Sequence, residues 1–217
     1  MAKSTEQLIV QLSEGLQPVK TLRPPLQRAL VWLAAIFGLG TAAVLAFSSP
    51  AVFDRRTLDG RESVELISTL ATGVLGVVAA FYLSLPDRSP RWAWLPWPAL
   101  GLWLASSGYG CYRLWATAGE RRWEVGESFH CLGFILGASL PLAIFLYGML
   151  RRASPLTPIR VAFTGGLGVA GLSAFLLQFF HPFDVTVIDL GLHLAAVTLV
   201  VAGGSLLAKP ALAGGGK

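Results

Sequence analysis

The chain has 217 residues, of which 54% are hydrophobic and 13% charged, and it carries a formal net charge of +5. Soluble domains usually have about 25% charged residues, so this composition excludes an ordinary soluble globular protein.

The first 25 residues are polar or amphipathic and precede every long apolar run. Ser4 and Gln7 have the spacing of a capping box, which predicts the start of a helix. Leu8, Leu12 and Leu16 then recur at every fourth residue and form an apolar stripe on one helix face. Because so short a helix is not stable alone in water, the stripe is expected to rest on the membrane surface or to dock in the groove of a partner.

Six uncharged runs follow, each of roughly 20 residues, which is the length of a helix that crosses the hydrocarbon core. They cover residues 29–47, 66–85, 92–112, 128–150, 161–180 and 190–208. Backbone polar groups in lipid must be satisfied within their own segment, so these runs predict helices. We therefore expect an all-α polytopic membrane protein: a cytoplasmic segment at 1–25, a bundle of six transmembrane helices at 26–208 and a tail at 209–217.

The basic residues predict the orientation of this bundle. Eleven of the 17 Lys and Arg residues fall on the side that holds both chain termini. The positive-inside rule then places both termini in the cytoplasm. Topology and attraction to anionic lipid account for the positive net charge, so direct nucleic-acid binding is not expected.

Small residues recur at every fourth position in three of the runs. They are Ala34-Gly38-Ala42, Gly133-Gly137 and Gly166-Ala170-Ala174. This spacing is typical of helices that pack closely in membranes. It predicts packing within one bundle, with a homodimer face as the alternative.

A cluster of polar side chains is expected at the opposite, outer end of the bundle. It holds both cysteines, all three histidines and three acids: Cys111, Glu127, His130, Cys131, His181, Asp184, Asp189 and His193. Spacings of three and four residues put several of them on shared helix faces. An ionisable residue inside a span, such as His193, is a functional candidate by default.

Two kinds of chemistry fit this cluster. Thiolate and imidazole together suit soft or borderline metals such as Zn, Cd or Cu, and an outward thiol is open to oxidation. A disulfide between Cys111 and Cys131 would need their Cα atoms about 4.4–6.8 Å apart. Interfacial hydrogen bonds, from His193 to Asp189 and from His130 to Glu127, are the structural alternative.

Three stretches carry a resemblance to a known family: "LRPPLQR" at 22–28, the segment 128–158 that begins "SFHCLGF", and "HPFDVTVIDLGLH" at 181–193. With them the chain resembles, over essentially its whole length, the NrsF family. These are bacterial inner-membrane negative regulators of an extracytoplasmic-function (ECF) sigma factor, sigma F. The resemblance implies an anti-sigma factor, not an enzyme, whose cytoplasmic segment holds the sigma factor. A periplasmic signal linked to heavy-metal stress, such as chromate or cadmium, would release it.

The resemblance also implies which residues act. The family's sensing is attributed to two cysteines on the periplasmic side, of which one matches Cys131 and the other falls at His181. A disulfide between these positions is therefore impossible here, whereas a mixed Cys/His site for a transient metal ion remains, completed by His130, Asp184 or His193. Supporting or redox roles then fall to Glu127, Asp189 and Cys111. Contact with the sigma factor is expected at Leu8, Leu12, Leu16, Leu22 and Arg23.

Two other function classes remain as alternatives. A small membrane transporter or metal exporter would place His193 and Asp189 on its path, although the sequence shows no ionisable residue deeper in a span. A di-haem or thiol-redox enzyme would pair His130 with His193 at matching depth.

Overall fold

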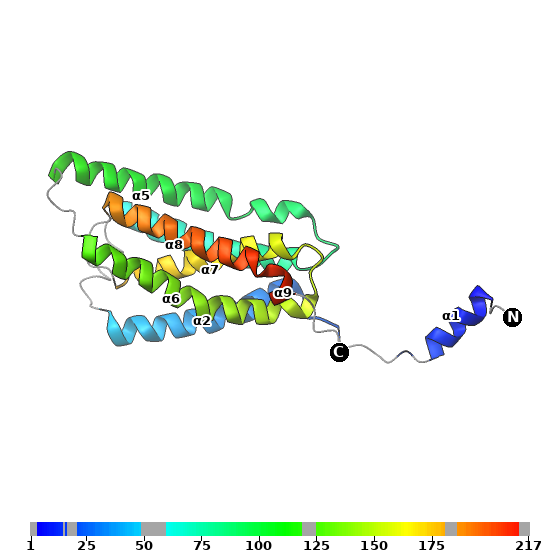
Figure 1. Ribbon diagram of the computed structural model, residues 1–217. Helices are drawn as coiled ribbons and strands as arrows, with labels where there is room; N and C mark the ends of the chain where they lie inside the picture. The colour runs from blue at the N-terminus through cyan, green and yellow to red at the C-terminus, as the bar shows by residue number, and fades with distance from the viewer. Residues whose placement is uncertain are drawn as a thin grey trace.

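The computed structural model describes residues 4–14, 16, 21–48, 60–118, 125–180 and 186–212 (Figure 1). All regular secondary structure in these ranges is helical. The longer helices are α1 (Thr5–Glu14), α2 (Pro25–Phe47), α4 (Gly60–Leu83), α5 (Trp97–Ala118), α6 (Val125–Leu150), α7 (Pro158–Leu177) and α8 (Val187–Leu206). The shorter ones are the 3-10 helices η1 (Pro90–Trp94) and η3 (Arg151–Ala153) and the one-turn helix α9 (Ala208–Leu212).

Five of these helices are long and apolar enough to cross a membrane. They are Pro25–Phe47, Glu62–Leu83, Phe129–Ala153, Pro158–Leu177 and Val187–Leu206. The remaining predicted run, 92–112, does not form one helix: it begins in η1 and continues in α5. Helix α5 has 22 residues but carries polar and aromatic side chains such as Ser106, Ser107 and Tyr109 along its length. The all-α class is therefore confirmed for the described residues, and five helices are candidate membrane spans, one fewer than the six predicted.

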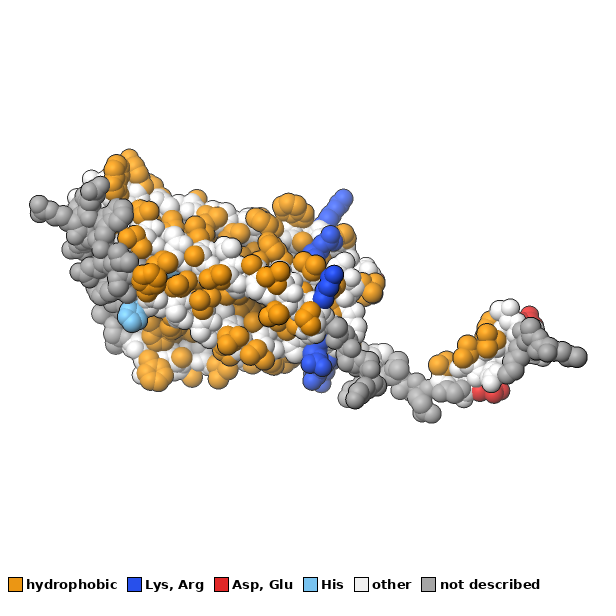
Figure 2. Space-filling model, viewed as in Figure 1, with side chains coloured by type: hydrophobic (Ala, Val, Ile, Leu, Met, Phe, Trp, Pro, Cys, Tyr) orange, Lys and Arg blue, Asp and Glu red, His pale blue; other side chains and the backbone are white. Residues whose placement is uncertain are grey.

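The long helices alternate in direction, which gives the bundle two ends (Figure 1). We call the end where α4, α6 and α8 begin the thiol end, because Cys111 and Cys131 lie towards it. We call the other end, where α2, α5 and α7 begin, the basic end, because Lys and Arg side chains gather there (Figure 2). Its described cations are Arg23, Arg28, Arg88, Arg91, Arg151, Arg152, Arg160 and Lys209.

Helix α7 lies at the centre of the bundle. In its most apolar stretch 72% of the residues are buried, against 11% for α2 and 17% for α8. Its closest neighbour is α4. A Cβ atom placed on Gly168 of α7 would lie 2.6 Å from the backbone nitrogen of Val77, and one on Gly76 of α4 would lie 2.7 Å from Gly168 Cα. Gly171 faces Gly73 in the same way, one turn along the two helices. A Cβ atom placed on Gly171 would lie 2.9 Å from the backbone nitrogen of Gly73. The two helices thus meet backbone to backbone.

The small-residue motifs predicted from the sequence divide into two groups. Gly166, Ala170 and Ala174 are in the core, and Gly166 packs against the backbone of Val201 on α8. Gly38, Gly133 and Gly137, in contrast, have open space where a Cβ atom would stand. The expectation that these two motifs pack within the bundle was wrong, since four-residue spacing marks a smooth helix face but does not say which face meets a neighbour.

Arg28 fastens the first turn of α2 at the basic end. Its side chain is 6% exposed, and its Nη2 donates a hydrogen bond to the carbonyl oxygen of Met149 at 2.5 Å. The guanidinium also lies over the Phe81 ring of α4, 5.1 Å from the centroid. One cation therefore connects α2 with the last turns of both α4 and α6.

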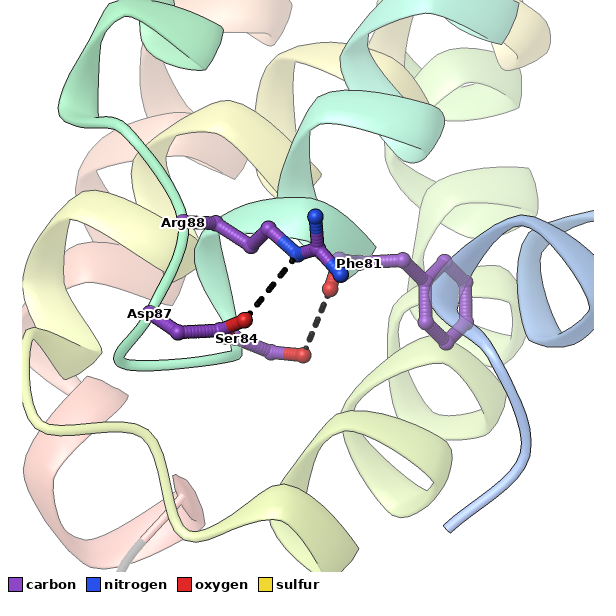
Figure 3. A network of polar contacts seen from close by, with 4 residues as sticks. All are labelled: Phe81, Ser84, Asp87 and Arg88. Carbon is purple, nitrogen blue, oxygen red and sulfur yellow. Dashed lines mark hydrogen bonds and ion pairs between the residues drawn. The ribbon is translucent and has the colours of Figure 1, made fainter.

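The end of α4 is closed by a short polar network (Figure 3). The Ser84 hydroxyl donates to the carbonyl oxygen of Phe81 at 2.7 Å, which satisfies one of the last carbonyls of the helix. Arg88 then pairs with its neighbour Asp87, with 3.5 Å between Nε and the carboxylate oxygen. Backbone hydrogen bonds from Leu85 to Tyr82 and from Arg88 to Leu85 form the turn that leads from α4 towards η1.

Candidate functional site

Cys131 is the most enclosed of the cluster members whose side chains the structure describes. It lies near the start of α6 with 2% of its surface exposed. Its apolar neighbourhood includes Ala174 and Leu177 of α7 and Ala196 of α8. The thiol is therefore set where three helices converge, and a change in the volume or charge at this sulfur would be felt by all three.

His130 does not share this environment, although it is adjacent to Cys131 in the sequence. It is exposed, because consecutive residues of a helix point about 100° apart. The prediction that His130 and Cys131 present one common face was therefore wrong. Glu127 belongs to α6 by its backbone, and its side chain lies outside the described residues.

Cys111 occupies a different place at the thiol end. It is buried on α5, and its Sγ donates to the carbonyl oxygen of Thr186 at 3.5 Å. Both cysteines are present as thiols, not as a disulfide. Cys111 thus contacts the beginning of α8, whereas Cys131 packs among α6, α7 and α8.

Asp189 has a structural role that the spacing with His193 did not reveal. Its carboxylate accepts hydrogen bonds from the backbone nitrogen and the hydroxyl of Thr186 at 2.9 and 2.7 Å, and its own nitrogen donates back to that hydroxyl. This is a complete capping box at the start of α8. The signal was present in the sequence as "TVID", a threonine followed three residues later by an acid. His193 lies one turn further along α8 and is partly buried.

His181 and Asp184 lie outside the described residues. Within the part of the chain that the structure does describe, no three His, Cys, Asp or Glu side chains come together to hold a metal ion. Cys131, His130 and His193 therefore do not form a complete metal site by themselves. A site that includes His181 or Asp184 stays a prediction.

A buried acidic strip on α4 was missed by the sequence analysis. Glu62 and Glu65 are both 4% exposed, and the strip continues with Thr69, whose hydroxyl accepts a hydrogen bond at 3.1 Å from Nε2 of Gln178, the residue that follows α7. The predicted span began at residue 66, but the apolar helix begins at Glu62. The spacing of 62, 65, 69 and 72 on one helix face was the available signal, and ionisable groups within a span are functional candidates.

The N-terminal arm, of which the structure describes residues 4–14, 16 and 21–24, presents its apolar side chains to the outside. The capping box is confirmed, because the backbone nitrogen of Ser4 donates to Gln7 and that of Gln7 to the Ser4 hydroxyl. Helix α1 stands apart from the bundle (Figure 1), and no residue in it is buried. The predicted contact residues Leu8, Leu12, Leu16, Leu22 and Arg23 are all exposed. The apolar stripe therefore lacks a cover within this chain's described residues.

Comparison with known proteins adds one finding. The chain matches the NrsF family, described as negative regulator of sigma F, over residues 12–213. No curated protein and no solved structure gives a significant match. The match includes the thiol end, the basic end and the second half of the N-terminal arm.

Proposed function

The chain belongs to the NrsF family of negative regulators of sigma F, and from that premise we propose the following function. It is an anti-sigma factor that holds an ECF sigma factor at the bacterial inner membrane. A periplasmic heavy-metal or redox signal releases the sigma factor. The observation that carries this proposal is the separation of two features: a buried thiol between three helices near one end, and an uncovered apolar arm beyond the other.

The topology in this proposal has six transmembrane helices and both termini in the cytoplasm. Helix α5 provides the sixth crossing beside the five more apolar helices. The cations at the basic end support a cytoplasmic position for that end by the positive-inside rule. Reporter fusions at the two termini test the orientation. A periplasmic signal from either would exchange the compartments of sensor and arm and overturn the mechanism.

The cytoplasmic segment 1–25 is the part that binds the sigma factor, and the transmembrane domain 26–208 and the tail 209–217 carry it. The support is the exposed stripe, in which Leu12 is 65% and Leu16 76% exposed. A helix of this length gains stability when its apolar face enters a groove of a partner. The sigma factor is therefore expected to order and cover α1.

Co-purification of the sigma factor tests the arm. We expect recovery with the full chain and loss with a chain that lacks residues 1–20. Leu12→Asp places a charge on the stripe and should also lose the partner. Gln11→Asp places the same charge one residue away, off the stripe, and should keep it. Equal recovery from all four chains would remove the arm from the mechanism.

Sensing in this proposal begins at Cys131. A soft metal ion such as cadmium binds thiolate, and binding releases the thiol proton. His181 supplies the second ligand, with His130, Asp184 or His193 completing the set. Because Cys131 is buried against α7 and α8, binding displaces these helices and changes the affinity of the arm for the sigma factor. A shift from 1:99 to 99:1 requires about 5.5 kcal/mol of preferential binding to one state.

Two cysteine variants test this step. A strain with Cys131→Ser is expected to lose induction of the sigma-dependent genes by cadmium. Cys111→Ser is the matched control, since it removes the other buried thiol, which donates a hydrogen bond to Thr186 at the start of α8 and is not a member of the Cys131 cluster. Unaltered induction in the Cys131→Ser strain would discard this thiol as the sensor, while the co-purification result would still stand on its own.

A further inference from the structure

A groove of about 910 Å³ opens at the basic end, between η1, the start of α7 and α9. Three of its lining residues are cations that come from three different elements: Arg91 of η1, Arg160 of α7 and Lys209 of α9. The described lining includes no acidic residue. Cations that converge from separate segments at one concave place indicate an anionic occupant.

The first turn of α7 adds to this preference. Thr157, Pro158 and Ile159 line the groove, and the Thr157 side chain makes no capping hydrogen bond. The beginning of a 20-residue helix is thus open to the groove, with its backbone N–H groups and the positive end of its dipole. Such a terminus favours phosphate groups.

The aromatic and apolar part of the lining places the groove at a membrane surface. Trp94 and Trp97 are exposed, with ring centroids 5.7 Å apart, and exposed tryptophans gather at the headgroup level of a bilayer. Phe163 of α7 also lines the groove and is exposed. The groove therefore combines three cations with exposed aromatic side chains near the start of a candidate membrane-spanning helix.

We propose that this groove binds an anionic phospholipid, with the phosphodiester among Arg91, Arg160 and Lys209 and the acyl chains along Phe163. Basic pockets between helices on the cytoplasmic side of membrane proteins suit this ligand. An acidic protein segment fits less well, because the lining combines its cations with the exposed aromatic side chains of Trp94, Trp97 and Phe163, which suit a bilayer. The inference is independent of sigma-factor binding and would hold if that proposal failed.

Native mass spectrometry of the full chain, released from nanodiscs that contain equal amounts of phosphatidylglycerol and phosphatidylcholine, tests the proposal. We expect preferential retention of phosphatidylglycerol. The triple variant Arg91→Gln, Arg160→Gln, Lys209→Gln should weaken retention by on the order of 10- to 100-fold. The matched control Arg88→Gln, Arg151→Gln, Arg152→Gln removes the same charge from the same end outside the groove, and should keep the preference.

Four other outcomes of these measurements would overturn the proposal that the groove binds an anionic phospholipid. Equal loss in both triple variants would show diffuse attraction, and no preference in the unaltered chain would show that no site exists. Displacement of the lipid by inorganic phosphate would identify a soluble ligand. A chain lacking residues 1–20 should retain phosphatidylglycerol as before. Increased retention in that chain would identify the arm, with Glu6 and Glu14, as the occupant.

Discussion

The contact between α4 and α7 makes a sharp prediction about Gly168. In Gly168→Ala the new Cβ would lie 2.6 Å from the Val77 nitrogen and 2.9 Å from the Gly76 carbonyl carbon. Both are backbone atoms, so the helices themselves must move apart. Overpacking against backbone atoms, which cannot rotate away, belongs to the upper part of the usual range and costs about 2–3 kcal/mol, whereas alanine in place of a helical glycine gains about 0.8 kcal/mol. We expect a net loss of about 1–2 kcal/mol in the free energy of unfolding.

Thermal unfolding of the purified protein in detergent measures this loss. A loss of 1–2 kcal/mol corresponds to a decrease in Tm of roughly 2–8 °C for a chain of this size. Gly133→Ala is the matched control, because its Cβ atom meets nothing within 4 Å. The control keeps the helix-propensity gain and should be as stable as the unaltered chain or slightly more stable. If Gly168→Ala were as stable as Gly133→Ala, the backbone contact between α4 and α7 would be refuted.

Three further predictions concern the two ends of the bundle. Arg28→Gln loses a buried charged hydrogen bond and should lower stability by about 1.5–3 kcal/mol, whereas exposed Arg23→Gln should change it by less than about 0.5 kcal/mol in the same melts. Thr186→Ala removes the cap of α8 and should cost about 1 kcal/mol; a cost equal to that of Thr198→Ala, within α8, would contradict the capping role. Buried Cys131 should react with an impermeant maleimide on the order of 100-fold more slowly than an exposed thiol, since access needs local opening of about 3 kcal/mol. A chain with Cys111→Ser, Cys131→Ser and His130→Cys provides that reference, and equal rates would show that Cys131 is accessible.

Much of the fold could be predicted because lipid leaves few choices to the backbone. An uncharged run of sufficient length must be a helix there, and five of the six predicted runs are candidate spans. The capping box of α1 was predicted as well, since it depends on two residues three positions apart. Both signals are local, so no knowledge of the neighbouring helices was needed.

The remaining features depend on which face of a helix meets which neighbour. Gly133 and Gly137 have the spacing of a packing motif but face outwards, while Gly73 and Gly76, spaced by three, meet α7. The start of α4 was placed too late because Glu62 and Glu65 are charged, although the fold buries both. Pattern alone did not distinguish a buried acid from one in a loop, since the difference lies in the partner helix.

The backbone contact at Gly76 and Gly168 also bears on how this protein tolerates change. Where two helix backbones meet this closely, there is no room for a Cβ atom between them, so a side chain at either position would force the helices apart. Sequence drift is accordingly expected to spare these glycines and to accumulate on the outward faces of α2 and α8, where a larger side chain merely displaces a lipid tail.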